Sequence, residues 1–211
     1  MIRRFLRLLL GLTLYAVGIV LTINAHIGYA PWDVLHAGIS ISLGMSIGLA
    51  SILVGLLICV VTWIFNEKIG IGSILNMVLI GVFIDVLFSI KLIPTSSNLG
   101  LGILELCCGL VVIAFASYYY ISSGFGAGPR DSLMVLLTRK TKLPVGLIRT
   151  CLEVFVSIAG WLLGGSVGIG TVLVSLLIGF CVHLVFALLK FDSTKVQHQS
   201  IAETIRLLKT S

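Results

Sequence analysis

Six long apolar stretches constrain the fold of this chain more than any other feature. They cover approximately residues 5–25, 46–65, 70–90, 100–122, 144–164 and 169–190. A helix of about 20 apolar residues crosses the hydrocarbon core of a bilayer, which is roughly 30 Å thick. The composition agrees, because 58% of the residues are hydrophobic and only 10% are charged, whereas about a quarter of a soluble domain is charged. We therefore predict an all-α membrane protein with six transmembrane helices.

Two shorter segments, about 31–43 and 129–141, follow turns that contain glycine and proline. They begin in His26-Ile-Gly-Tyr-Ala-Pro-Trp-Asp33 and in Gly124-Phe-Gly-Ala-Gly-Pro-Arg-Asp131. In both, the proline suits the first position of a helix. The aspartate falls in the first turn, where a carboxylate can meet unpaired N–H groups and the positive end of the helix dipole. Each segment is too short to cross alone, so we expect a short re-entrant or interfacial helix.

The two helix starts belong to an internal repeat with a shift of 98 residues. The matched residues include glycines, a tryptophan and both Pro–Asp pairs, which chance pairing of apolar sequences would not readily align. The pairs are Gly11-Leu12 with Gly109-Leu110, Gly28 with Gly126, Pro31 with Pro129, Asp33 with Asp131, Gly48-Leu49 with Gly146-Leu147, Trp63 with Trp161, Gly70-Ile-Gly72 with Gly168-Ile-Gly170, Ile80-Gly81 with Ile178-Gly179 and Phe88 with Phe186. We divide the chain into a first transmembrane repeat (1–98), a second transmembrane repeat (99–192) and a tail (193–211).

Basic residues set the expected orientation. If six helices cross and the N-terminus is cytoplasmic, nearly all flanking basic residues fall on the cytoplasmic side, and only Lys91 falls outside. Those on the cytoplasmic side are Arg3, Arg4, Arg7, Lys68, Arg139, Lys140, Lys142, Lys190, Lys195, Arg206 and Lys209. This is the positive-inside pattern, and it places both termini in the cytoplasm.

Three crossings per repeat is an odd number, so the two halves should insert upside down relative to each other. Oppositely oriented, broken helical segments are the pattern of secondary transporters built from inverted repeats. The alternative topology counts both short segments as full crossings and has eight spans. It orients both repeats the same way, and the middle basic cluster then loses its consistent side.

The two ends of the chain carry separate expectations. The apolar run that follows Arg3, Arg4 and Arg7 has no convincing cleavage site. We expect a retained first span, with a removed signal peptide as the alternative. In the tail, Ser200 and Glu203 have the spacing of a capping box. This spacing favours a short amphipathic helix at the cytoplasmic interface, and a frayed end is the alternative.

Two charged residues near the start of the fifth apolar stretch form the first candidate site. Arg149 and Glu153 are four residues apart and therefore share one helical face. An ionisable residue inside a span costs about 2.5–3.5 kcal/mol on insertion scales. One interpretation is a structural ion pair. The other is that Arg149 joins Arg130 in a basic pocket for an anionic ligand or a lipid head group.

The repeat places four further candidates symmetrically. Asp33 and Asp131 either cap the short helices or bind a transported cation, and the readings overlap, since a cap that holds a re-entrant helix is also part of a gate. Asp85 and His183 are repeat mates in the third and sixth spans. They form a candidate proton relay, because an imidazole titrates near neutral pH and burial can raise a carboxyl toward it. The alternative is that each bonds a neighbouring backbone group.

No signature of an enzyme, a metal site or a cofactor site stands out. The cysteines lie inside apolar runs without zinc or disulfide spacing; they are Cys59, Cys107, Cys108, Cys151 and Cys181. Gly-Ala-Gly-Pro-Arg-Asp is not the Gly-x-Gly-Asp arrangement of intramembrane aspartyl proteases, and no phosphate loop is present. We expect no catalytic residue, no metal and no cofactor. The net charge of +6 reflects membrane orientation and does not imply nucleic acid.

The sequence resembles the YczE/YyaS/YitT family of bacterial integral membrane proteins over nearly its whole length. The resemblance rests on Gly-x-x-Pro-Trp-Asp in the first half, Gly-x-Gly-Pro-Arg-Asp in the second half, Arg149, Glu153 and Gly164-Gly-Ser-Val-Gly-Ile-Gly-Thr171. It implies a multi-pass protein of the bacterial plasma membrane with about six spans. It implies little about activity, and no catalytic residue is carried over from it.

The duplication and the polar residues of its two helix starts predict transport of a small solute. The expected site lies between the two starts, with Asp33, Asp131, Arg130, Arg149 and Glu153 as candidate binding residues, and the arginines favour an anionic solute. The competing class is a non-transporting scaffold, regulator or accessory subunit in the same lipid bilayer. Either class is compatible with a homo-oligomer.

Overall fold

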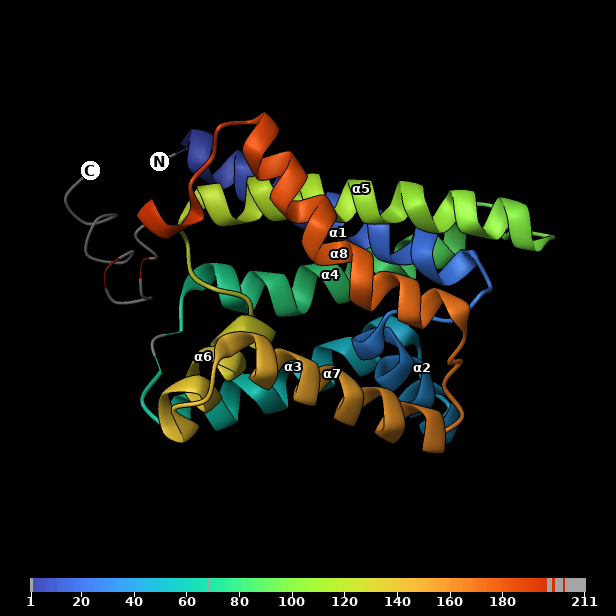
Figure 1. Cartoon of the computed structure of the whole chain (residues 1–211), viewed down its shortest axis with the longest axis horizontal. Coiled ribbons are helices and arrows are strands. Elements are labelled where there is room, and N and C mark those ends of the chain that lie inside the picture. Colours follow the sequence, from blue (N-terminus) through green and yellow to red (C-terminus); the bar gives the residue numbers. More distant parts are fainter. Residues whose placement is uncertain (1, 68, 197–198, 200–202, 204–211) are drawn as a thin grey trace.

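The computed structural model describes residues 2–67, 69–196, 199 and 203, and these contain helices and no strand. The predicted all-helical class is confirmed (Figure 1). The helices are α1 (Ile2–Asn24), α2 (Pro31–Leu43), α3 (Ile47–Ile64), α4 (Ile71–Ile90), α5 (Leu99–Ser123), α6 (Pro129–Thr141), α7 (Val145–Leu162), α8 (Ile169–Leu188) and the 3-10 turn η1 (Ser193–Lys195).

Six of the described helices are long and apolar enough to cross a membrane. They are α1, α3, α4, α5, α7 and α8, with mean hydropathies between 1.6 and 2.6. The helices α2 and α6 have 13 residues each and span about 20 Å at 1.5 Å per residue, less than the hydrocarbon core. The predicted number of six long apolar helices is therefore confirmed, and the chain is a multi-pass membrane protein.

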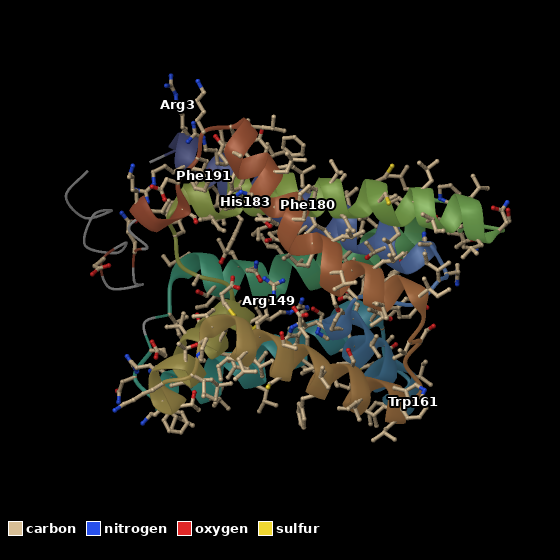
Figure 2. The ribbon with its side chains drawn as sticks, viewed as in Figure 1. Arg3, Arg149, Trp161, Phe180, His183 and Phe191 are labelled. Carbon is tan, nitrogen blue, oxygen red and sulfur yellow. The ribbon has the colours of Figure 1, made fainter. Side chains whose placement is uncertain are left out.

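The outer surface carries large apolar side chains, as a lipid-facing surface should. Phe155 and Trp161 on α7 and Leu176 on α8 are mostly exposed, and Figure 2 shows Trp161 pointing away from the bundle. A soluble protein rarely exposes a contiguous apolar surface of this extent. Polar groups are instead found inside, including the nearly inaccessible side chains of Asp33 and His36.

The helices α1 and α5 form the central pair of the bundle, where they run side by side (Figure 1). Glycines permit this close approach. A Cβ at Gly11 would lie 2.7 Å from the backbone nitrogen of Tyr120, and one at Gly109 would lie 2.9 Å from the carbonyl oxygen of Gly18. Small residues at helix contacts are the usual means by which membrane helices pack closely.

The helix bounds of the two halves agree after the 98-residue shift. The helices α2, α3 and α4 begin and end 98 residues before α6, α7 and α8, respectively. Contacts between the halves also occur in matched pairs. Gly72 N donates to Phe125 O at 2.8 Å, and Gly170 N donates to Ile27 O at 2.6 Å. The shift converts each partner of the first bond into a partner of the second.

The start of the tail returns to the second helix start, where Gln199 N donates to Gly124 O at 2.9 Å. The expected amphipathic helix around Ser200 lies almost wholly outside the described residues. It remains a prediction.

Candidate functional site

A partly open cavity of about 350 Å³, lined by both polar and apolar side chains, lies between the helices. The start of α2 contributes Trp32 and His36 to its wall, and the start of α6 contributes Arg130 and Asp131. Both glycine–proline helix starts therefore meet at one cavity, although they are far apart in the sequence. Its volume falls in the range of small-molecule sites, about 300–1,000 Å³.

Proline determines where the two short helices begin. Pro31 and Pro129 each occupy the first helical position, where a missing N–H is not needed and a fixed φ suits the helix. The preceding Gly28 and Gly126 have φ of +106° and +127°, which residues with a Cβ adopt with strain. These turns place the first turns of α2 and α6 beside the cavity.

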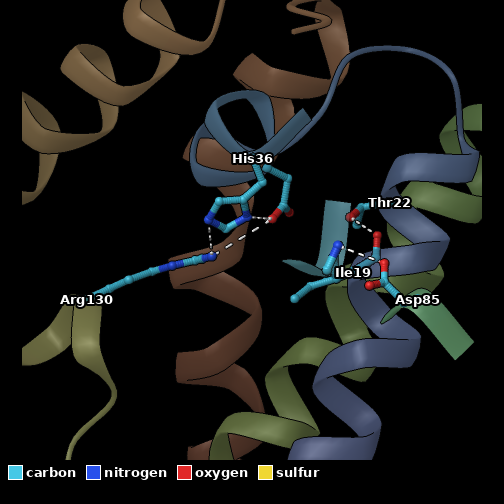
Figure 3. Close-up of polar contacts among 7 residues, drawn as sticks. Ile19, Thr22, His36, Asp85 and Arg130 are labelled. Carbon is cyan, nitrogen blue, oxygen red and sulfur yellow. Dashed lines mark hydrogen bonds and ion pairs between the residues drawn. The ribbon is translucent and has the colours of Figure 1, made fainter. Parts of the chain in front are cut away.

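Buried Asp33 and His36 and the partly exposed Arg130 form a polar cluster beside the cavity, and Figure 3 shows Arg130 reaching toward His36. Asp33 and His36 lie one turn apart on α2, with Nδ1 3.3 Å from the carboxylate Oδ1. Arg130 reaches across from α6, and its Nη2 lies 3.5 Å from His36 Nε2 and 3.9 Å from Asp33 Oδ1. A guanidinium only donates, so Nε2 accepts and the ring proton is assigned to Nδ1, facing Asp33.

Arg130 also packs against an aromatic ring. Its guanidinium carbon lies 5.0 Å from the centroid of Trp32, within the range of a cation–π contact. The side chain is 39% exposed, whereas Asp33 and His36 are nearly inaccessible. The cluster therefore presents a positive group to the cavity and keeps the compensating carboxylate behind it.

The second charged pair lies on α7, which also lines the cavity. Arg149 Nε donates to Glu153 Oε1 at 2.8 Å along one face of α7, and both residues line the cavity. Figure 2 shows Arg149 pointing into the molecule. The structure thus brings Arg130, Asp131, Arg149 and Glu153 to one cavity, with Asp33 directly behind Arg130.

The candidate relay residues lie outside this cavity. Asp85 on α4 accepts hydrogen bonds from Ser46 Oγ at 2.5 Å and from Gly48 N at 2.9 Å. His183 is exposed on α8, and neither residue belongs to the cavity wall. The proton-relay assignment stays a prediction, and Asp85 has a specific structural partner instead.

Sequence reasoning missed several polar residues of the site. His36 carries a local signal, because it follows Asp33 by three residues and so shares its helical face. Tyr15 and Ser117 carry none. Their oxygens lie 2.6 Å apart at the cavity, but they come from α1 and α5, and only the packing of these helices joins them.

The site has no arrangement typical of a metal centre. Within the part of the chain that the structure describes, no group of three His, Cys, Asp or Glu side chains is placed to hold an ion. Arginines, a histidine, carboxylates and hydroxyls converge instead. Such a set can bind a small polar or charged solute by hydrogen bonds and charge.

Comparison with known proteins gives the family. Residues 2–187 match the model of DUF6198, described as a family of unknown function. An uncharacterized membrane protein YczE of Bacillus subtilis is 41% identical over 171 residues, which cover 80% of this chain and 79% of the relative. An uncharacterized protein of Haemophilus influenzae is 34% identical over 176 residues, covering 83% and 80%. The uncharacterized protein YyaS of Bacillus subtilis is 26% identical over 177 residues, covering 83% and 88%.

These matches confirm the resemblance to the YczE and YyaS proteins that the helix-start motifs indicate. No solved structure matches the chain significantly. The family match covers both helix starts and every helix that lines the cavity, from α1 to α8. The chain therefore belongs to the DUF6198 family.

Proposed function

We propose that this protein is a secondary transporter that binds a small solute in the cavity between the starts of α2 and α6. The observation that carries the proposal is the convergence of both broken helix starts on one partly polar cavity within an apolar bundle. Broken helical segments at membrane depth are tolerated where protein or a polar cavity satisfies their backbone groups. In transporters, substrate sites form at such segments.

The matched contacts between the halves support an inverted repeat. A two-fold relation exchanges the halves, so each contact must recur with its partners swapped. Gly28 packs on Gly168, and their repeat mates Gly126 and Gly70 pack on each other. The exchanged hydrogen bonds of Gly72 and Gly170 follow the same rule. With three long helices in each half, this relation turns the second half upside down, and α2 and α6 become re-entrant or interfacial helices on opposite sides.

The basic residues orient this arrangement with both termini in the cytoplasm of a bacterial cell. The start of α1 and the end of α8 lie on one side of the molecule, and the connection from α4 to α5 lies on the other (Figure 1). In this orientation α2 belongs to the outer side and α6 to the inner side.

The proposed solute carries an anionic group. Arg130 lies 3.5 Å from His36 Nε2 and 3.9 Å from Asp33 Oδ1, and both contacts are longer than the distance of about 2.7–2.9 Å at which a charged N–H to oxygen bond is strongest. A bound carboxylate or phosphate can therefore form shorter bonds with Arg130 than the resting contacts. Arg149 on α7 is a second donor at the same cavity.

The proposal predicts that Arg130→Gln reduces solute uptake about tenfold or more, because one charged hydrogen bond contributes about 1.5–3 kcal/mol. The purified protein is reconstituted in vesicles and exposed to a defined mixture of carboxylates, phosphate and amino acids. Accumulated solutes are measured by mass spectrometry against protein-free vesicles.

Arg139→Gln is the matched control, because Arg139 lies on the same helix but pairs with Glu67 at 2.8 Å, outside the cavity. It should leave uptake unchanged. Uptake equal to that of protein-free vesicles for every anion, or full uptake by Arg130→Gln, would contradict the proposal and favour a scaffold or accessory role.

A further inference from the structure

The helices α3 and α4 are in close contact along Ser46, Gly48, Gly81 and Asp85, and we call this contact the α3–α4 seam. A Cβ at Gly48 would lie 2.0 Å from the carbonyl oxygen of Gly81, so the two backbones are in direct contact. Asp85 stabilises the same contact, because its carboxylate accepts hydrogen bonds from Ser46 Oγ at 2.5 Å and from Gly48 N at 2.9 Å. The start of α3 is thus held against the last turns of α4.

The equivalent place in the second half is open. Gly146 and Gly179 are the repeat mates of Gly48 and Gly81. Among the described residues, a Cβ at either position would meet no atom of a neighbouring element within 4 Å. The helices α7 and α8 make almost no contact beyond their connection, and Figure 1 shows them diverging from it.

The opening leads to the cavity. Leu152 and Glu153 of α7 and Ile178 and Val182 of α8 all line its wall. The cavity therefore lies behind the gap between α7 and α8, and the seam between α3 and α4 closes the corresponding path in the first half.

Several other contacts recur in both halves. The hydrogen bonds of Gly72 and Gly170 recur in both halves with similar lengths. The contacts of α1 with α4 and of α5 with α8 also match. The short helices differ as well, since α2 packs on α7 and α3 more extensively than α6 packs on α3 and α7. Two halves of similar sequence with unlike contacts correspond to one of two states, and the exchanged state has the α3–α4 seam open and the α7–α8 seam closed.

We infer that the α3–α4 seam and the α7–α8 seam are the outer and inner gates of the cavity, which open alternately, and that Asp85 is the latch of the outer gate. The inference rests on the proposed transport function and adds the gates to it. In the described structure the outer gate is closed and the inner gate is open.

The hydrogen bond between Ser46 and Asp85 is present in the first half alone, so the closed outer gate is more stable than the closed inner gate. Pro144 and His183 stand at the repeat positions of Ser46 and Asp85. Proline has neither an N–H nor a hydroxyl, so the Ser46–Asp85 bond has no counterpart in the second half. A closed inner gate lacks that bond, and the state that faces the cytoplasm is the resting state.

The gates are tested by one pair of introduced cysteines and one reporter cysteine, with the five native cysteines replaced by alanine. Gly146→Cys and Gly179→Cys together should form a disulfide upon oxidation, because closure of the inner gate brings them together. Both positions lie in open space, so the replacements should not impair folding. The reporter is Val54→Cys in the middle of α3, which lines the cavity.

An impermeant maleimide should label the reporter from the cytoplasmic side before oxidation and from the outer side after it. Asp85→Ala should raise labelling from the outer side severalfold without oxidation. Ser89→Ala is the matched control. The Ser89 hydroxyl donates to the backbone carbonyl of Asp85 in its own helix and not to α3 among the described residues, so its loss should leave labelling unchanged.

Labelling from the cytoplasmic side alone in every variant, with no cross-link between positions 146 and 179, would overturn the gate assignment. This readout needs no solute, so it is separate from the transport test. Uptake by the wild type with a fixed labelling pattern would refute the gates alone. Exchange of labelling without uptake of any anion would refute the proposed solute class and leave the gates standing.

Discussion

Gly28→Ala is expected to lower the stability of the folded protein by about 2–5 kcal/mol. The residue has φ of +106°, and a left-handed backbone costs a residue with a Cβ roughly 1–2 kcal/mol. The added Cβ would also lie 2.4 Å from the nitrogen of Gly168 and 2.6 Å from its Cα. These are backbone atoms at the start of α8 and cannot rotate away, so overpacking adds about 1–3 kcal/mol. The measurement is the unfolding midpoint in detergent.

Gly44→Ala separates the two causes. Gly44 also has positive φ, at +65°, but no neighbouring atom lies within 4 Å of its Cβ position among the described residues. It should show only the strain, about 1 kcal/mol. Gly126→Ala should resemble Gly28→Ala, because its Cβ would lie 2.7 Å from Gly70 Cα. Equal effects at positions 28 and 44 would show that the contact between the halves is not formed.

Asp33→Ala is expected to lower stability by about 1–3 kcal/mol, because it removes the carboxylate that faces the buried His36 Nδ1 and the half-exposed guanidinium of Arg130. Asp33 Oδ1 lies 3.9 Å from the guanidinium and 3.3 Å from His36 Nδ1, and the carboxylate is nearly inaccessible. Combining Asp33→Ala with Arg130→Met should restore part of the loss, because the positive charge that Asp33 faces is then removed as well. Denaturant unfolding in detergent measures all three variants.

Lys195→Ala is the control for this comparison of the single and double variants of Asp33 and Arg130. Lys195 pairs with Asp192 at 3.3 Å, but its side chain is 82% exposed, and exposed pairs contribute about 0–1 kcal/mol. Strict additivity of Asp33→Ala and Arg130→Met would mean that the two residues do not interact. The polar cluster would then have no role in holding α2 against α6.

Local signals explain which parts of the fold were predictable. The apolar stretches predict the six long helices because each helix satisfies its own backbone in lipid. Pro31 and Pro129 mark the first residues of α2 and α6, since proline is suited to that position and no other in a helix. The 98-residue shift predicts equal bounds in the two halves, which the helices have.

The site was predictable only where its residues share a local pattern. Arg149 and Glu153 are one turn apart on α7 and do pair. The contact of Arg130 with Asp33 depends instead on how α6 packs near α2, and a repeat relates two residues without bringing them together. The sequence also did not predict which of the two proposed gates is closed, because two similar halves are compatible with closure of either the α3–α4 gate or the α7–α8 gate. Only the differences at Pro144 and His183 favour one of them.

The central claim is that the two halves lie upside down relative to each other, and labelling from each side of the membrane tests it most directly. Leu43 and Thr141 are repeat mates at the ends of α2 and α6, and both are exposed. In a background without cysteines, an impermeant maleimide should label Leu43→Cys only from outside the cell and Thr141→Cys only from the cytoplasmic side. Labelling of both positions from the same side would contradict the inverted repeat and the transport mechanism built on it.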